Sequence, residues 1–239
     1  GGLVSPPTEE GVPQGGPLSP LLSNLFLDDL DRELERRGHR FVRYADDCNI
    51  YVRSERAGRR VMETIKRYLG KKLKLKVNEK KSKVARANQV KFLGFRIIKS
   101  QKGPKRGIAK ESLERFKRRV RELTGRSRGR SLDHLIEELS KYLAGWRGYY
   151  GHCETPKVLR DLDSWIRRRL RSYAWEQWET FSRRKTKLIG LGIRPGTASH
   201  MAWRGCGRGP WHLSRTKAMH QALDNRFFRE HGLVSLVGT

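Results

Sequence analysis

The sequence is poor in cysteine and has no long hydrophobic run. Its three cysteines, Cys48, Cys153 and Cys206, are isolated and form no Cys-x-x-Cys pair. A disulfide framework and a zinc ribbon are therefore not expected. His200, Cys206 and His212 could be read as a metal cluster, but their spacing matches no strong zinc pattern. With no visible signal peptide or membrane span, a cytoplasmic location without a membrane partner is the expectation.

Acidic residues are scarce as well. The 239 residues hold 53 Lys and Arg against 25 Asp and Glu, a formal net charge of +28. Such a chain repels itself, so a polyanion is the expected partner. Nucleic acid is the commonest one, because phosphate neutralisation releases counterions. A basic soluble protein without such a partner, or one that binds an anionic membrane, is the alternative.

The basic residues do not form a tail. Residues 1–100 hold 22 basic and 12 acidic residues, and residues 101–239 hold 31 and 13. Hydrophobic residues make up 36%, and there are six Trp, seven Tyr and eight Phe. This aromatic content is too high for a disordered chain. A folded, basic protein is predicted.

The N-terminal part mixes helical and strand patterns after a Gly/Pro-rich loop over residues 1–20. A helix is expected from Ser19 as N-cap, with Pro20 in its first turn and a stop at Gly38. β formers on both sides of an Asp-Asp centre predict two strands joined by a tight turn. Further expected elements, in order, are a helix over 54–69, a short strand over 73–77 and a strand pair over 90–98.

After Gly103-Pro104 the pattern becomes helical. Leu113, Phe116, Val120 and Leu123 form an amphipathic stripe. Further helices are expected from Ser131 and from Thr155-Pro156, an irregular basic segment over 182–215, and a last helix over 215–231. The fold class is therefore α+β: an antiparallel hairpin sheet with helices, followed by an α-helical part. The expected domains are 1–105, 106–180 and a basic extension over 181–239.

Asp46 and Asp47 stand at the predicted hairpin turn. Asp is common in turns, so turn chemistry alone can explain the pair. Two adjacent carboxylates on a rigid hairpin are also suited to Mg²⁺, which prefers hard oxygen ligands. Phosphoryl transfer by two metal ions needs such ligands clustered at the reacting groups. The surrounding segments must decide between the two interpretations.

Three segments favour the second interpretation. Glycines in the Gln14, Gly15, Gly16, Pro17 block permit close backbone approach to a ligand, although such runs are usually loops. Lys81, in the Asn78-Glu79-Lys80-Lys81-Ser82 segment, could neutralise triphosphate charge or be one more solvated lysine. Phe92, Leu93, Gly94 and Phe95 form an apolar turn that could equally be ordinary core.

In this order the motifs resemble the reverse transcriptases encoded by group II introns. The similarity runs through Pro13 to Asn24, Arg43-Tyr44-Ala45-Asp46-Asp47, Asn78 with Lys81-Ser82, and Phe92-Leu93-Gly94-Phe95. Leu143 to Tyr150 and Trp165 to Leu170 look like the maturase-specific thumb of that family. The segment around Gly209-Pro210-Trp211 is also similar. The resemblance covers nearly the whole chain.

The resemblance implies a polymerase palm followed by a thumb. Asp46 and Asp47 would be catalytic metal ligands for two Mg²⁺ ions. Gln14, Gly15, Gly16 and Pro17 would lie near template and incoming nucleotide, with Lys81 near the triphosphate, and Phe92, Leu93, Gly94 and Phe95 would form the primer grip. Basic thumb helices would bind RNA through Arg147, Arg160, Arg167, Arg168 and Arg171, because A-form helices are recognised by shape and phosphates.

The implied partners are group II intron RNA, a template–primer duplex and dNTPs in a bacterial cytoplasm; a homodimer is left open. The family also has fingers and an earlier acidic palm strand, for which residues 1–239 show no counterpart, so the isolated chain is expected not to polymerise. No nuclease pattern of the His-Asn-His type is seen. A non-catalytic RNA-binding maturase is the main alternative, and a reverse transcriptase outside introns is a third.

Overall fold

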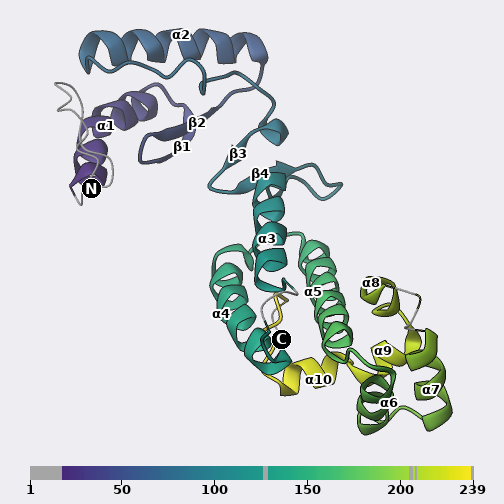
Figure 1. The fold of residues 1–239 in the computed structure, drawn as a ribbon. Coiled ribbons are helices and arrows are strands. Elements are labelled where there is room, and N and C mark those ends of the chain that lie inside the picture. The colour runs from purple at the N-terminus through teal and green to yellow at the C-terminus, as the bar shows by residue number, and fades with distance from the viewer. Residues whose placement is uncertain (1–17, 126–128, 205–206, 208, 238–239) are drawn as a thin grey trace. The chain divides into compact units, whose positions relative to one another are not determined.

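The computed structural model describes residues 18–125, 129–204, 207 and 209–237. They divide into two compact units between Phe92 and Leu93. The first unit combines helices with a β-hairpin, and the second is mainly helical (Figure 1). The predicted α+β composition, with small antiparallel sheets, is confirmed. None of the helices in these described ranges is both long and apolar enough to cross a membrane.

The first unit opens with a helix that ends at a glycine. The elements are α1 (Ser19–Arg36), β1 (Arg40–Tyr44), β2 (Asp47–Tyr51), α2 (Glu55–Lys72), the 3-10 helix η1 (Ala87–Gln89) and β3 (Lys91–Phe92). Leu18, not Ser19, is the N-cap of α1, and no side-chain hydrogen bond caps it. At the other end Gly38 has φ +69° and its N–H bonds to the Glu35 carbonyl. The predicted stop at Gly38 is confirmed, since glycine adopts this left-handed conformation without strain.

A small core holds these elements together. Leu30 and Leu34 of α1 pack with Val61 and Ile65 of α2, and partly buried side chains of the hairpin, including Ile50, join them. The Ser54 hydroxyl caps α2 by accepting the N–H of Ala57. These contacts fix the hairpin against two helices.

The strand predicted over 73–77 is wrong. The chain there leaves α2 without strand pairing. Lys74 takes a positive φ of 56°, and the N–H of Leu75 bonds back to the carbonyl of Leu69. The backbone therefore continues the end of α2, and Leu73 packs on the small core. The alternation of Leu and Lys over 73–77 therefore belongs to an irregular segment that follows α2.

The second unit begins with a hairpin and three long helices. The elements are β4 (Phe95–Ile98), β5 (Lys105–Ile108), α3 (Lys110–Leu123), α4 (Leu132–Tyr150) and α5 (Pro156–Gln177). The three predicted helices are confirmed, with Ser131 accepting the His134 N–H as N-cap. β5 was not predicted. It pairs antiparallel with β4, and Gly107 hides it in the sequence, because glycine is depleted in strands.

Gly107 leaves room for a side chain of the paired strand. A Cβ at Gly107 would overlap the Ile98 side chain on the paired strand. The missing side chain lets Ile98 lie across the backbone of β5.

The prediction of an irregular 182–215 segment is wrong. It contains α6 (Phe181–Gly190), α7 (Pro195–Arg204) and α8 (Pro210–Leu213), and the last helix is split into α9 (Lys217–Ala222) and α10 (Asn225–Glu230). The hydroxyls of Thr180 and Thr216 and the carboxylate of Asp224 each cap a helix start. The helices are short and interrupted by glycine, so their periodicity is weak over any long window.

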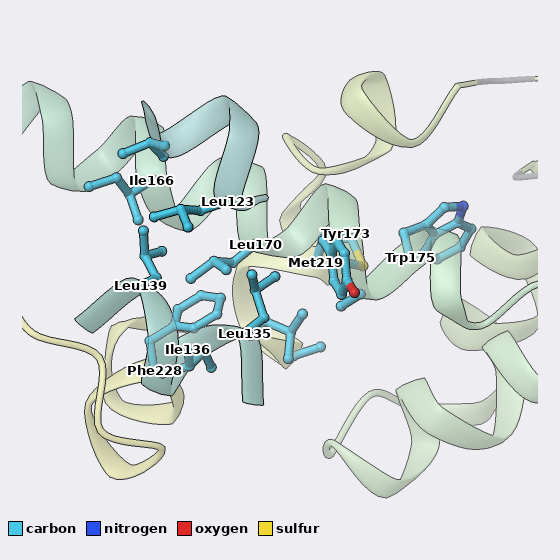
Figure 2. Packing of buried hydrophobic residues seen from close by; sticks show 14 of the residues in the cluster. Leu123, Leu135, Ile136, Leu139, Ile166, Leu170, Tyr173, Trp175, Met219 and Phe228 are labelled. Carbon is cyan, nitrogen blue, oxygen red and sulfur yellow. The ribbon is translucent and has the colours of Figure 1, made fainter. Parts of the chain in front are cut away.

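One hydrophobic cluster joins all the helices of the second unit. Figure 2 shows side chains from α3 (Leu123), α4 (Leu139), α5 (Ile166, Trp175), α9 (Met219) and α10 (Phe228). The segment 181–237 therefore shares the core of residues 106–180.

The chain after α10 returns into this core between α4 and α5 (Figure 1). The buried carboxylate of Asp163 accepts the hydroxyl of Ser235 and the N–H groups of Leu236 and Val237. Leu236 itself is only 1% exposed. The segment Ser235–Val237 is thus tied to α5, and Leu236 is part of the hydrophobic core of the second unit.

Candidate functional site

The turn between β1 and β2 presents the Asp46-Asp47 pair. Tyr44 pairs with Asp47, which leaves Ala45 and Asp46 as a two-residue loop. Ala45 has φ +52°, a conformation that costs a non-glycine residue free energy and needs support from its surroundings. Tyr44 is 64% exposed beside the loop. The predicted strand–turn–strand is confirmed.

Arg43 supplies that support. Its Nη1 donates to the carbonyl oxygen of Ala45 at 2.9 Å and to Oδ1 of Asn24 at 2.9 Å. Its Nε donates to Oδ1 of Asp31 at 2.8 Å, and the hydrogen bond to Asp31 raises the pKa of Arg43 while burial opposes it. Asn24 and Asp31 belong to α1. One guanidinium therefore ties the loop to the neighbouring helix.

The two carboxylates at this tip are exposed and without partners. Among the residues that the structure describes, the side chains of Asp46 and Asp47 make no hydrogen bond and no ion pair, although the chain carries 53 basic residues. Other acidic groups of this unit, such as Asp31 and Glu33, are held by arginines. Free, exposed carboxylate oxygens at a fixed turn fit a hard divalent cation.

The carboxylate set is nevertheless small. No group of three or more His, Cys, Asp or Glu side chains comes together in the described ranges. Cys48, across from Arg43 in the hairpin, adds no ligand: burial, with a smaller contribution from Asp31, raises the pKa of its thiol to about 11, while Arg43 opposes the shift. A neutral thiol is a poor ligand for Mg²⁺.

The loop that carries Lys81 is ordered by Asn78. The N–H of Lys81 bonds to the side-chain oxygen of Asn78 at 3.2 Å, and the N–H of Ser82 bonds to its carbonyl at 2.9 Å. Close by in sequence, Val84 lies so near α2 that a Cβ at Gly58 would be 2.7 Å from it. The Lys81 side chain is exposed. The Gln14, Gly15, Gly16 and Pro17 block lies outside the described residues.

The predicted primer-grip turn has an unusual backbone. Leu93 and Gly94 both have positive φ, 49° and 76°. Leu93 is 39% exposed, and Phe92 and Phe95 are half-buried. The Leu93 side chain is thus exposed, while Phe95 packs on the hydrophobic cluster of the second unit.

The five arginines proposed as RNA contacts lie in different environments. Arg160 is exposed and Arg167 half-buried on α5. Arg147 donates to the Ser235 carbonyl at 3.3 Å. Arg168 lies 3.8 Å from the ring centre of Trp211 and donates to that residue's carbonyl, and burial, followed by Arg215, lowers its pKa.

Arg171 is a correction to this set. Its side chain is 3% exposed, and its Nε donates to the Leu223 carbonyl at 2.8 Å. Burial, with Arg167 next, lowers its pKa to about 10. It lies 5.6 Å from the Phe228 ring. Arg171 therefore holds α9 and α10 to α5 and is not available as a surface contact.

The basic extension predicted over 181–239 contains a long stretch without acidic residues. From Thr180 to Leu223 the chain holds nine Lys and Arg and no Asp or Glu. This stretch forms α6 to α9, on which Trp203 is 70% exposed. A run of basic residues with no acidic residue along the sequence, plus an exposed aromatic ring, is typical of nucleic-acid contacts. The absence of acidic residues over such a length is the feature of the sequence that indicates a nucleic-acid-binding surface here.

Comparison with known proteins defines the class. Residues 4–97 match the reverse transcriptase (RNA-dependent DNA polymerase) family, and residues 113–189 match the group II intron, maturase-specific domain. A polymerase segment is thus followed by a maturase segment. The chain belongs to the group II intron reverse transcriptase/maturase family.

One curated protein is similar to part of the chain. Protein YkfC of Escherichia coli (strain K12) is 30% identical, with the match covering 38% of this chain and 33% of the relative. The chain therefore spans about a third of the length of that protein.

Proposed function

We propose that this chain serves an RNA-directed DNA polymerase that also binds group II intron RNA and assists its splicing. Asp46 and Asp47 carry the catalytic part of the proposal, and the basic helices of the second unit carry the RNA-binding part. The single observation on which the first part rests is the unpaired state of these two carboxylates among the described residues of a chain of net charge +28.

Unpaired carboxylates in so basic a chain need an explanation. A lysine or arginine beside them would stabilise the tip at no cost to a purely structural turn. Their lack of a cationic partner keeps the oxygens free for another cation. Mg²⁺ is the cation that suits this role, and when bound it neutralises charge on the reacting phosphate oxygens.

The protein's own residues set the position of those oxygens. Arg43 holds the Ala45 carbonyl and thereby fixes the loop against α1. Rigid placement of ligands is what a metal-assisted site requires. Asp46 lies in the loop itself and Asp47 begins β2, so both depend on the same clamp.

The remaining polymerase contacts are assigned by their place in the sequence. Gln14, Gly15, Gly16 and Pro17 are proposed to contact template and incoming nucleotide, and Lys81 to contact the triphosphate. Phe92, Leu93, Gly94 and Phe95 are proposed to hold the primer end. The exposure of Lys81 and of Leu93 supports these roles.

Intron RNA is proposed to bind the basic helical surface. Arg160 and Arg167 are its candidates on α5, with Arg147 and Arg168 contributing from half-buried positions. The acid-free stretch from Thr180 to Leu223 extends this surface. Phosphate contacts of this kind read backbone shape rather than base sequence.

A non-catalytic maturase is the second candidate. It is favoured by the small size of the carboxylate set in the described residues. In that case the RNA-binding surface would carry the function and Asp46-Asp47 would be a turn.

Metal binding tests the catalytic proposal directly. Mn²⁺ titration followed by electron paramagnetic resonance should give weaker binding in Asp46→Asn and Asp47→Asn than in the wild-type chain. Asp28→Asn is the matched control, since Asp28 is an exposed aspartate on α1 paired with Arg32. Equal Mn²⁺ binding by all four proteins would refute the metal site.

Splicing separates the two candidates. Intron RNA splicing should fall in Arg160→Glu and Arg167→Glu. If primer extension by a polymerase containing this chain is unchanged in Asp46→Ala, while the arginine variants lose splicing, the non-catalytic maturase is correct.

A further inference from the structure

The Leu93-Gly94 turn is held by three side chains from two helices. The hydroxyl of Tyr149, near the end of α4, donates to the Leu93 carbonyl at 2.9 Å. The hydroxyl of Ser112, on α3, donates to the Gly94 carbonyl at 3.1 Å. Tyr150 lies so close that a Cβ at Gly94 would overlap its hydroxyl. All of these residues belong to the second unit.

The contacts engage both carbonyls of a strained turn. Leu93 is a non-glycine residue with positive φ, a conformation that persists when the surroundings hold it. The Gly94 carbonyl also accepts the N–H of Ala109 at 2.9 Å. The two peptide units that flank Gly94 are therefore each held by hydrogen bonds to their carbonyl oxygens.

The aromatic rings add a second layer. Phe95 stacks on Tyr149 with ring centres 5.7 Å apart and lies 5.2 Å from the ring of Tyr150. Tyr150 in turn packs at 4.6 Å on Trp146 of the same helix. The C-terminal residues of α4 therefore pack against Phe95, the residue that follows Gly94.

We propose that Tyr149 and Ser112 are positioning residues that set the Leu93-Gly94 turn for the primer terminus, so that the maturase-specific helices determine where the primer end is held. This inference rests on the proposed role of the turn in holding the primer. Ser112 gives the clearer test of the proposal: it is only 7% exposed, so it acts on nucleic acid only through the turn. Tyr149 is 50% exposed and could touch the duplex as well.

We expect the affinity for the template–primer duplex and the position of the primer end to respond differently to substitution of Tyr149 and Ser112. Duplex binding depends on many phosphate contacts spread over the chain. The two hydroxyls orient two adjacent peptide units. Removing either should leave overall affinity nearly unchanged and displace the primer end.

Photocrosslinking shows which peptide of the chain the primer end contacts. The full chain is bound to an RNA template annealed to a DNA primer that ends in 4-thiothymidine, irradiated and digested with trypsin. Lys91 and Arg96 flank the turn, so a crosslink there appears on the peptide Phe92–Arg96. The wild-type chain should give this adduct, and Tyr149→Phe and Ser112→Ala should reduce its yield at least fivefold, with the duplex Kd changed less than twofold.

Tyr173→Phe is the matched control. Its hydroxyl also donates to a backbone carbonyl, that of Arg130 at 2.7 Å, elsewhere in the same unit. It should crosslink like the wild type. Thermal melting of each variant shows whether the fold is retained, and Ser112→Thr, which keeps a hydroxyl, should restore the adduct.

The outcomes distinguish the two claims. A wild-type adduct that persists undiminished in Ser112→Ala and Tyr149→Phe overturns the positioning role and leaves the primer contact standing. A wild-type chain that binds the duplex but crosslinks elsewhere overturns the primer contact itself, and the positioning role with it.

Discussion

The guanidinium of Arg43 donates to the carbonyl oxygen of Ala45, two residues further along the chain, at 2.9 Å. The same group binds Asp31 and Asn24 of α1. Arg43 thus couples the conformation of a tight loop to a helix that precedes it in sequence. The exposed pair Asp46-Asp47 is held in place through this relationship.

Replacing Arg43 by Lys should destabilise the first unit by about 2 kcal/mol. Lysine keeps the charge but loses the planar fork that reaches three acceptors at once. Urea unfolding measures the loss, and Mn²⁺ binding should weaken with it because the loop loses its support. Arg36→Lys is the control: the Arg36 side chain is 69% exposed and lysine can keep the ion pair with Glu33, so its effect should stay below about 0.5 kcal/mol.

Gly94→Ala should destabilise the second unit by roughly 2–3 kcal/mol. The new methyl group would meet both a positive φ and the hydroxyl of Tyr150. Adding Tyr150→Phe should recover part of the loss, which thermal unfolding of the double variant measures. Gly148→Ala is the contrast, since nothing lies within 4 Å of a Cβ there and alanine favours a helix by about 0.5–1 kcal/mol. A harmless Gly94→Ala would contradict the observed packing.

Asp163→Ala should cost about 3 kcal/mol of unfolding free energy. It leaves the buried N–H group of Leu236 and the hydroxyl of Ser235 without their carboxylate acceptor, whereas the N–H of Val237 keeps the Ser235 hydroxyl as a second acceptor. Hydrogen exchange of residues 233–237 should accelerate along with it. The exposed neighbour Asp161 is the matched control, and Asp161→Ala should be close to neutral.

Cys48 should react slowly with alkylating reagents at neutral pH. Burial raises the pKa of its thiol from 9.0 to about 11, so the reactive thiolate stays rare until pH approaches that value. A raised acid pKa means that the folded state holds its proton more tightly. The stability linked to it is complete below pH 9 and is lost as pH rises from 9 toward 11. Iodoacetamide labelling of the Cys48 peptide across this range, compared with the urea-unfolded chain, checks the shift; equal rates in both states would disprove it.

Arg160 and Arg171 should separate RNA contact from packing. Arg160→Gln should lower the salt dependence of RNA binding, reducing the slope of log K against log salt by about 0.7–1 without a change in stability. Arg171→Gln should instead cost about 2 kcal/mol of stability, because a buried hydrogen bond to Leu223 is lost. Fluorescence anisotropy at several salt concentrations and urea unfolding give the two readouts. If Arg171→Gln lowered the salt slope of RNA binding and left stability unchanged, Arg171 would be an RNA contact and not a packing residue.

The sequence by itself determined the features that short-range patterns encode. Alternating β formers around Asp46-Asp47 predicted the hairpin, and the stripe from Leu113 to Leu123 predicted α3. Caps at Ser54 and Ser131 follow from hydrogen bonds three residues away. The family also followed from sequence, because its motifs keep their order along the chain.

Only the tertiary structure decided which side chains are free to act. Arg160 and Arg171 look alike on one helix, but Leu223, fifty-two residues after Arg171, covers only the second. Tyr149 and Leu93 meet across fifty-six residues. Burial of this kind depends on which distant segment packs against a given face, and no local periodicity records it. For the same reason the short helices α6 to α8 were predicted to be irregular, and only the shared core explains them.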